Sequence, residues 1–327
     1  MVRQLIDSFG RVHRDLRISV TDRCNFRCTY CMPADGLEWL PREELLTFEE
    51  IERVARLMVE RHGVDSIRLT GGEPTVRAKL STLVGMLADL PVDLSMTTNG
   101  TTLRAQAGDL SAAGLKRINI SLDSLRADRF AELTLRNDLE RVLDGIDAAI
   151  QAGLDPVKVN VVVMRDVNDD EIVDLARFGR DRGVEVRFIE FMPLDADRSW
   201  SEGAVVGRDE IVARIAEAFP LEPVDRTSAP ATRYRYLDGA GCFGVVASVT
   251  RSFCDTCDRI RLTADGQFRN CLFAVEEFDL RSLLRSGASD DDVSDLLQGA
   301  VAAKWAGHGI SSVDFIRPSR SMSQIGG

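Results

Sequence analysis

The sequence has few of the features that mark membrane, secreted or nucleic-acid-binding proteins. It contains no apolar run near the roughly 18–20 residues that span a bilayer. Its N-terminus has neither the apolar core nor the small-residue cleavage site of a signal peptide. Positive charge is also scarce, because 41 Lys and Arg face 52 Asp and Glu, which gives a net charge of −11. We therefore expect a cytoplasmic protein that spans no membrane and binds no nucleic acid, since phosphate backbones favour basic surfaces.

The seven cysteines are odd in number and do not form the dispersed pattern of a disulfide framework. Cys242 stands alone, and the other six fall into two tight groups. Such short spacings in a protein of the reducing cytosol indicate metal binding or redox chemistry. The two groups are Cys24, Cys28 and Cys31, and Cys254, Cys257 and Cys271.

Alternating apolar patterns predict strands that are separated by amphipathic helices. The expected strands cover 16–20, 66–70, 93–97, 117–122, 157–163 and 184–191. The expected helices cover 49–62, 77–89, 102–113, 138–152, 169–182 and 208–218. This alternation is typical of βαβ crossovers and a parallel sheet. The prediction is an α/β fold with an incomplete, TIM-like (β/α)6 barrel.

The chain changes character near residue 220, where prolines and short β-rich pieces replace the strand–helix pattern. Residues 1–220 are predicted to form the partial barrel. Residues 221–327 are predicted to form a smaller α+β domain that closes one side of it. The short strands expected in this second domain cover 234–237, 244–249 and 259–262.

Each expected barrel strand has one apolar and one polar face, whereas a parallel strand buried on both sides would be apolar throughout. The pattern predicts a barrel with a polar, partly cationic interior. Active sites of such barrels lie at the carboxyl ends of the strands. The polar faces carry Arg17, Arg68, Thr97, Lys158 and Arg187.

The first cysteine group follows the first expected strand directly, with the spacing C-x3-C-x2-C. Three thiolates on one short loop suit a [4Fe–4S] cluster whose fourth iron stays open to another ligand. The alternative is a structural zinc site, which would need a fourth ligand. The position at the end of a strand favours the cluster.

The second cysteine group has the spacing C-x2-C-x13-C, which by itself leaves two interpretations. Structural zinc is one, with Cys242 or His308 as the fourth ligand. A second open [4Fe–4S] cluster is the other, and Cys242 would then be a buried apolar residue or would complicate the ligation.

Arg259 and Arg261 lie between the cysteines of the second group and share one face of an expected strand. Two arginines on one strand face usually point to solvent. Beside a metal loop that caps a cationic cavity, they are better suited to clamp a phosphate group.

The first cysteine loop resembles that of the radical S-adenosylmethionine (SAM) superfamily. In that superfamily the open iron binds SAM, and reductive cleavage of SAM gives a 5′-deoxyadenosyl radical. The Gly-Gly-Glu-Pro turn at 71–74 matches the SAM-binding turn of these enzymes, although Gly-Gly alone predicts any tight turn. The resemblance implies that SAM contacts Tyr30, Gly72, Ser121 and Met192.

Further stretches resemble one family within this superfamily, the GTP 3′,8-cyclases of molybdenum-cofactor biosynthesis. They cover 7–11, 16–24, 67–74, 97–100, 119–123, 188–193, 252–261 and the terminal Gly326-Gly327. The resemblance implies that the radical removes the C3′ hydrogen of GTP, that C3′ then adds to C8 of guanine, and that one-electron reduction gives 3′,8-cyclo-7,8-dihydro-GTP. It also implies two [4Fe–4S] clusters, SAM, an electron donor, and a separate synthase that converts the product to cyclic pyranopterin monophosphate. Both a monomer and a homodimer are compatible with the sequence.

The resemblance also assigns the GTP site residue by residue. The guanine end is expected at the open iron of the second cluster, and the two-glycine tail is expected to reach toward the active site. Because hydrogen-atom abstraction needs no general base, the chemistry agrees with our expectation that His13, His62 and His308 all lie off the polar faces. The implied GTP contacts are Arg17, Arg68, Thr97 (or its neighbour Thr98), Lys158, Arg187, Arg259, Ile260 and Arg261, with Arg17, Arg259 and Arg261 catalytic.

Two other functions compete with this interpretation. A different radical SAM enzyme with a second cluster, such as one that modifies peptides, would need a peptide-recognition domain, and none is visible before Cys24. A zinc-stabilised binding module is disfavoured by the polar interior and by the acidic net charge.

Overall fold

The computed structural model describes residues 2–33, 35–195, 198–224, 229–310, 312 and 315–326. A single twelve-stranded sheet runs through this part of the chain. Its strands are β1 (Asp15–Ser19), β2 (Ser66–Thr70), β3 (Asp93–Thr98), β4 (Arg117–Ser121), β5 (Val157–Val163), β6 (Glu185–Glu190), β7 (Leu221–Pro223), β8 (Thr232–Tyr236), β9 (Cys242–Val246), β10 (Arg259–Leu262), β11 (Gln267–Arg269) and β12 (Phe278–Asp279).

The helices lie mainly between the strands. The α-helices are α1 (Phe48–His62), α2 (Leu80–Ala88), α3 (Leu103–Ala112), α4 (Ala127–Thr134), α5 (Leu139–Gln151), α6 (Ile172–Arg182), α7 (Arg208–Ala218), α8 (Leu280–Arg285), α9 (Asp290–Ala302) and α10 (Met322–Ile325). Short 3₁₀ turns lie at η1 (Arg42–Glu44), η2 (Pro74–Val76), η3 (Asp169–Glu171), η4 (Glu202–Ala204) and η5 (Cys254–Thr256). Local sequence sets such bounds: Thr47 and Glu50 form a capping box at the start of α1, and Gly63 ends it at φ 74°.

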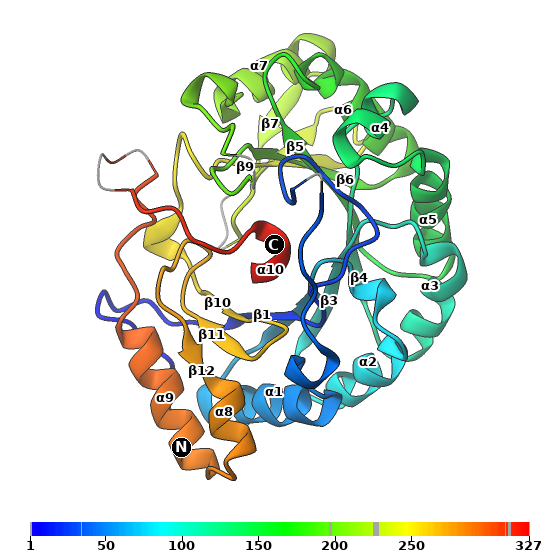
Figure 1. The fold of residues 1–327 in the computed structure, drawn as a ribbon. Helices are drawn as coiled ribbons and strands as arrows, with labels where there is room; N and C mark the ends of the chain where they lie inside the picture. Colours follow the sequence, from blue (N-terminus) through cyan, green and yellow to red (C-terminus); the bar gives the residue numbers. More distant parts are fainter. Residues whose placement is uncertain are drawn as a thin grey trace.

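The strands β1 to β6 and the helices between them confirm the predicted alternation to within a few residues at each end. The sheet curves into a partial barrel, with helices on its outer side (Figure 1). The strand order is β12-β11-β10-β1-β2-β3-β4-β5-β6-β9-β8-β7. Helix α4, between β4 and α5, is an addition that the sequence pattern did not predict.

The segment after residue 220 extends the sheet at both edges, whereas the sequence led us to expect it on one side. At one edge β10 pairs in parallel with β1, and at the other β9 pairs in parallel with β6. Antiparallel hairpins then flank each of these strands. Helix α10 lies inside the ring of strands, as Figure 1 shows. The division of the chain at residue 220 stays a prediction.

The core lies between the outer face of the sheet and the surrounding helices. In β5 buried residues alternate with partly exposed ones, as expected for a strand with one apolar face. Leu16 and Ile18 of β1 and Ile67 and Leu69 of β2 are fully buried in this layer. Each such side chain contributes about 1.5–3 kcal/mol through burial. None of the helices within the described residues is long and apolar enough to cross a membrane.

Candidate functional site

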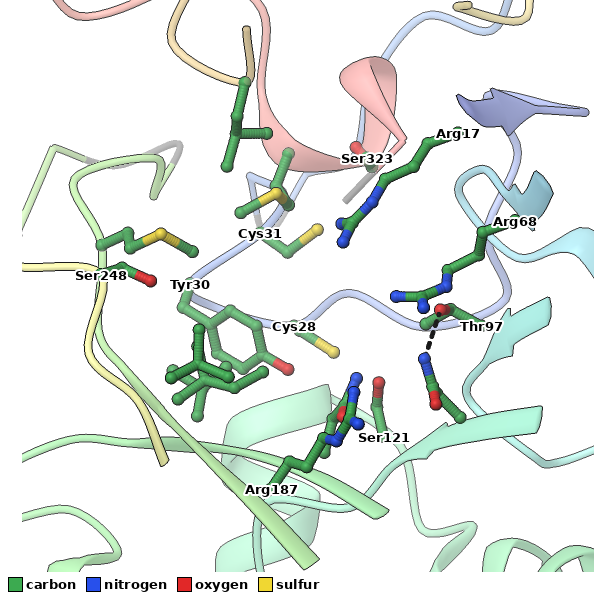
Figure 2. A pocket seen from close by; sticks show the side chains of 18 of the residues that line it. Arg17, Cys28, Tyr30, Cys31, Arg68, Thr97, Ser121, Arg187, Ser248 and Ser323 are labelled. Carbon is green, nitrogen blue, oxygen red and sulfur yellow. Dashed lines mark hydrogen bonds between the residues drawn. The ribbon is translucent and has the colours of Figure 1, made fainter. Parts of the chain in front are cut away.

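A cavity opens at the carboxyl ends of the parallel strands, where the polar strand faces predicted it. Side chains from several strands, the first cysteine loop and the C-terminal segment line it (Figure 2). Among the predicted site residues, those lining it are Cys24, Cys28, Cys31, Cys254, Cys257, Cys271, Tyr30, Gly72, Ser121, Met192, Arg17, Arg68, Thr97, Arg187, Arg259 and Arg261.

The first cysteine group forms a compact loop after β1. The Cys31 amide donates to the Cys28 carbonyl at 2.9 Å, and the Phe26 amide donates to Cys24 Sγ at 3.4 Å. Burial, followed by the charge of Glu73, raises the pKa of Cys24 to about 11. Burial and the neighbouring thiols raise that of Cys31 to about 12 and that of Cys28 well above its usual range. Half-buried thiols on one short loop fit a cationic metal group, because a bound metal favours their thiolate forms.

The Gly71-Gly72 turn packs directly on this cysteine loop. A Cβ atom on Gly71 would lie 2.6 Å from the carbonyl oxygen of Thr21, and one on Gly72 would lie 2.5 Å from that of Asp22. The turn therefore needs both glycines for packing alone. Both also line the cavity, so the backbone of the turn is open to a ligand such as SAM.

Glu73 is a buried carboxylate that joins the ends of two strands beside this turn. Its Oε1 accepts hydrogen bonds from Thr98 Oγ1 at 2.6 Å and Thr75 Oγ1 at 2.5 Å, and its Oε2 accepts one from the Asn99 amide at 2.6 Å. Burial raises the pKa of Glu73. The sequence motif included this residue, but its role in fixing the end of β3 relative to β2 depends on contacts that only the fold reveals.

Tyr30 is held in the cavity wall by Asp123, which was not among the predicted site residues. The Tyr30 hydroxyl donates to Asp123 Oδ2 at 2.5 Å, and the Val162 amide donates to Oδ1 at 2.8 Å. Burial raises the pKa of Asp123 to about 6 and that of Tyr30 well above its usual range. The signal for Asp123 was present in the sequence, because it follows Ser121 on the same polar face.

In the second cysteine group, Cys254 begins η5, Cys257 lies between η5 and β10, and Cys271 follows β11. The Cys257 amide donates to the Cys254 carbonyl at 3.1 Å. Burial opposes ionisation of Cys257, but the charges of Arg259 and Lys304 outweigh it and lower the pKa of this thiol to about 7. A thiol that ionises so readily is well suited to bind a metal.

Among the described residues, no three His, Cys, Asp or Glu side chains, those of either cysteine trio included, gather closely enough to hold one metal ion, which disfavours structural zinc. The thiolates of a [4Fe–4S] cluster each bind a different iron and can lie farther apart. Cys242 begins β9, where its Sγ lies 2.7 Å from Arg233 Nη2. His308 does line the cavity, so the expectation that every histidine lies away from it was wrong. His308 lies in the irregular segment after α9, where strand periodicity gives no information about which way a side chain points. Its ring packs on Phe273.

Buried and half-buried arginines form the cationic part of the cavity wall. Arg17 and Arg261 are direct neighbours in the register of β1 and β10, and Figure 2 shows Arg17 and Arg68 on one side of the cavity. Burial, with nearby cations, lowers the pKa of Arg68 to about 9 and lowers that of Arg261 well below its usual range. Arg17 Nε is buried and has no hydrogen-bond partner within the described part of the chain. A wall of this kind fits an anionic ligand.

Two of the predicted GTP contacts do not line the cavity. Lys158 turns toward Glu185, with 3.9 Å between its Nζ and the Oε1 atom of that residue. The side chain of Ile260 is fully buried in the apolar core, because it points to the opposite face of β10 from its arginine neighbours. Thr97 and Thr98 both line the cavity, but the Thr98 hydroxyl already donates to a buried carboxylate, which leaves Thr97 as the better contact.

Helix α10 brings the C-terminal segment into the mouth of the cavity. Ser323 lies beside Cys31, where its polar groups lower the pKa of that thiol against the effect of burial. Arg261 Nη1 donates to the Gly326 carbonyl oxygen at 2.9 Å. Gly326 therefore lies where the tail was expected, whereas Gly327 lies outside the described residues. The contact between Ser323 and the first cysteine loop could not be found from sequence, because the two are almost the whole chain apart.

Two family models match the chain. The radical SAM superfamily matches residues 18–179, which include the end of β1, the first cysteine loop and β2 to β5. The family described as Molybdenum Cofactor Synthesis C matches residues 184–310, which include β6 and the second cysteine group. The two matches together cover both cysteine groups and most of the cavity wall.

Curated relatives resemble the chain over almost its whole length. A GTP 3′,8-cyclase of Rhodopirellula baltica is 51% identical over 99% of this chain and 92% of its own length. A GTP 3′,8-cyclase of Corynebacterium glutamicum is 48% identical over 99% of this chain and 90% of its own length. A Mycobacterium tuberculosis protein named GTP 3′,8-cyclase 2 is 50% identical over 99% and 92% of the two chains.

Solved structures of low sequence identity share the fold. Streptococcus suis SuiB, in a crystal structure bound to S-adenosylmethionine, has a TM-score of 0.63 at 12% identity and covers 90% of this chain and 69% of its own. Methylornithine synthase has a TM-score of 0.50 at 16% identity over 63% of this chain and 62% of its own. At these identities the likeness concerns the fold alone.

Proposed function

Because this chain belongs to the radical SAM superfamily and, within it, to the GTP 3′,8-cyclases, we propose that it converts GTP to (8S)-3′,8-cyclo-7,8-dihydroguanosine 5′-triphosphate. This reaction is the first step of molybdenum-cofactor biosynthesis. The observation that carries the proposal is one cavity in which two cysteine trios meet a wall of buried and half-buried arginines. The cysteines suit iron–sulfur clusters, and the arginines suit a triphosphate.

The first cysteine trio is the proposed site of the cluster that works with SAM. Cys24, Cys28 and Cys31 would hold a [4Fe–4S] cluster that, with SAM and an electron, supplies a 5′-deoxyadenosyl radical. The backbone of Gly72 is open to SAM at the cavity wall, and Tyr30 is fixed beside the cysteines by its hydrogen bond to a buried carboxylate. Ser121 and Met192 complete the proposed SAM contacts.

The arginine wall is the proposed site of the triphosphate. Arg17, Arg68 and Arg261 present donors whose charge is only partly balanced within the protein, so a triphosphate would complete their pairing. Thr97 and Arg187 add further donors to the wall. Held in this way, the nucleotide would keep its ribose between the two cysteine trios, with C3′ turned to the radical source. Positioning and exclusion of water are the protein's contribution, since the cofactor supplies the reactive species.

The second cysteine trio is the proposed site of a second [4Fe–4S] cluster. Cys254, Cys257 and Cys271 would leave one iron open to the guanine end of GTP. The low pKa of the Cys257 thiol supports this proposal, and so does the absence, among the described residues, of three side chains close enough to hold a single ion such as zinc. Arg259 lies beside this trio and would bridge the cluster end and the phosphate end of the substrate.

The clearest test of the GTP site is the pair of substitutions Arg259→Ala and Arg261→Ala. Each variant should lose at least tenfold in affinity for GTP, because a charge-assisted hydrogen bond contributes about 1.5–3 kcal/mol and each 1.4 kcal/mol is tenfold. Iron content should equal that of the unaltered protein. The exposed Arg251, paired with Asp209, serves as the control in Arg251→Ala. GTP turnover at the normal rate in both cavity variants would refute the assignment.

The reaction also needs partners that lie outside this chain. An electron donor must reduce the clusters, and a separate synthase must take the cyclised nucleotide to cyclic pyranopterin monophosphate. We expect both in the cytoplasm with this enzyme. The predictions for its assembly remain a monomer or a homodimer.

A further inference from the structure

The stretch at residues 7–11 matched the family, but nothing in the cavity uses it. Its carboxylate, Asp7, is buried and accepts four hydrogen bonds. Oδ1 accepts from the Phe9 and Arg11 amides at 2.9 and 3.0 Å. Oδ2 accepts from Arg11 Nε at 2.5 Å and pairs with His13 Nε2 at 3.0 Å. One carboxylate therefore fixes two side chains, and each leads to a different cysteine.

The first of these side chains, Arg11, reaches the second cysteine group through its backbone. Arg11 Nη1 donates to the Cys254 carbonyl oxygen and to the Ala306 carbonyl oxygen, both at 2.7 Å. Its Nη2 donates to the Trp305 carbonyl oxygen at 2.6 Å. Arg11 thus joins the cysteine loop to the segment that follows α9.

The second side chain, His13, reaches a cysteine sulfur through Lys304. His13 Nδ1 lies 3.3 Å from Lys304 Nζ, and both side chains are buried. Lys304 Nζ in turn lies 3.8 Å from Cys257 Sγ and 2.8 Å from the Arg259 carbonyl oxygen. An ammonium group has donors only, so His13 Nδ1 accepts and its Nε2–H donates to Asp7. Every link in the series therefore has a defined direction.

We propose that Asp7, Arg11, His13 and Lys304 form a buried polar frame that positions Cys254 and Cys257, and that Lys304 donates an N–H···S hydrogen bond that raises the reduction potential of the second cluster. The inference rests on the proposed function, because it presumes that cluster. The four residues are positioning residues, since only Lys304 contacts the sulfur of a proposed ligand and none lines the cavity.

The expected direction of the potential follows from charge. Reduction adds one negative charge to the cluster and its thiolates. A buried ammonium group beside one thiolate stabilises that extra charge, and hydrogen bonds to ligand sulfurs are a recognised determinant of cluster potential. Removal of the ammonium group should therefore make the second cluster harder to reduce, while the first cluster should keep its potential.

A merely structural role for Lys304 is the competing explanation, since its bond to the Arg259 carbonyl oxygen also supports β10. The variants Lys304→Met and Lys304→Arg separate the two roles. Lys304→Met removes the charge and the donor, and Lys304→Arg keeps both. The exposed lysine before β4, in Lys116→Met, is the matched control for loss of one positive charge.

The experiment is an anaerobic redox titration of the full-length, reconstituted protein followed by electron paramagnetic resonance. Signals perturbed by SAM report the first cluster, and signals perturbed by GTP report the second. In Lys304→Met the midpoint potential of the second cluster should become more negative. In Lys304→Arg it should stay close to that of the unaltered protein. An unchanged second midpoint in Lys304→Met would overturn the hydrogen bond to sulfur.

A second measurement tests the frame if Lys304→Met does not fold. Asp7→Asn weakens the bonds of residue 7 to both Arg11 and His13. Iron should therefore leave the second site severalfold faster in the presence of a chelator, while loss of iron from the first site stays unchanged. Equal loss rates in Asp7→Asn and the unaltered protein would overturn the frame. If the unaltered protein binds one cluster only, the proposed second cluster fails, and this inference fails with it.

Discussion

Asp15 is the carboxylate that faces most of the arginines in the cavity. Burial raises its pKa, but Arg17, Arg68, Arg259 and Arg261 outweigh burial and lower it. One of its oxygens, Oδ1, is buried without a hydrogen-bond partner within the described residues. Asp258 also faces Arg17 and Arg259, but two carboxylates among four arginines still leave net positive charge at this wall, which a bound triphosphate would offset.

Lys158 gives a pH dependence that can be measured. Burial, followed by the charge of Arg187, lowers the pKa of Lys158 to about 8, although Glu185 acts in the opposite direction. Arg117 and Arg233 are the other charged groups that face Lys158, and both also lower its pKa. Lys158 does not line the cavity, but its neighbour Arg187 does, so a bound triphosphate should still attract the ammonium form, and affinity for GTP should fall modestly as pH rises through about 8. Titration of GTP binding on both sides of this pH checks the prediction. Lys158→Met should bind GTP more weakly and without this step, and identical pH profiles would contradict it.

The sequence predicted the cavity residues that lie on strands, because strand periodicity determines which way their side chains point. Alternation placed Arg17, Arg68 and Arg187 inside the barrel correctly, because a strand has only two faces. It did not find Ser323 or His308, since both reach the cavity through irregular segments whose paths depend on tertiary packing. It placed Lys158 on the right face but could not show that a carboxylate draws it away.

At the scale of elements, residues 315–326, which include α10, lie across the mouth of the cavity, and we call this segment the strap. Arg317 pairs with the buried Asp195 at 2.9 Å. Arg320 pairs with Asp265 and Glu277, each at 2.8 Å. These ion pairs hold the strap to the barrel and to the C-terminal strands. They help to keep α10 inside the ring of strands, because a helix this short has little apolar surface of its own.

Gly326 tests whether this inserted position matters. A Cβ atom there would lie 2.6 Å from Thr70 Oγ1 and 3.0 Å from Ser19 Cβ, and φ is +81°. Gly326→Ala should displace the tail and lower turnover at least tenfold, which corresponds to about 1.4 kcal/mol. Gly287→Ala is the control, because that glycine has the same φ of +81° but open space around it. Similar turnover in the two variants would show that the position of the tail is unimportant.

The elements of the barrel could be predicted from sequence, and the placement of the C-terminal strands could not. The periodicity of β1 to β6 is strong because every strand has one apolar and one polar face. Pairing of β9 with β6 and β10 with β1 joins distant parts of the chain, and no local pattern encodes it. Helix α9 begins at a capping box formed by Ser289 and Asp292, and we did not predict this helix from the sequence.

At the scale of the whole molecule, the pairing of β10 with β1 is what makes one site from two ends of the chain. Its register sets Arg259 beside Asp15 and Arg261 beside Arg17. The second cysteine group flanks β10, and the first follows β1, so the same pairing brings both trios to one cavity. The fold alone does not select the substrate, because SuiB shares it at 12% identity. The family relationship points to GTP, and the arginine wall is the part of the cavity that we propose binds it.

The transfer of hydrogen from C3′ of GTP tests the central claim most directly. The reconstituted enzyme would be supplied with SAM, a reductant and GTP that carries deuterium at C3′, and the 5′-deoxyadenosine formed would be examined by mass spectrometry. The account predicts one deuterium in that product together with a 3′,8-cyclised nucleotide, and none when deuterium is at C2′. Unlabelled 5′-deoxyadenosine from the C3′-labelled substrate, or no dependence of its formation on GTP, would contradict it.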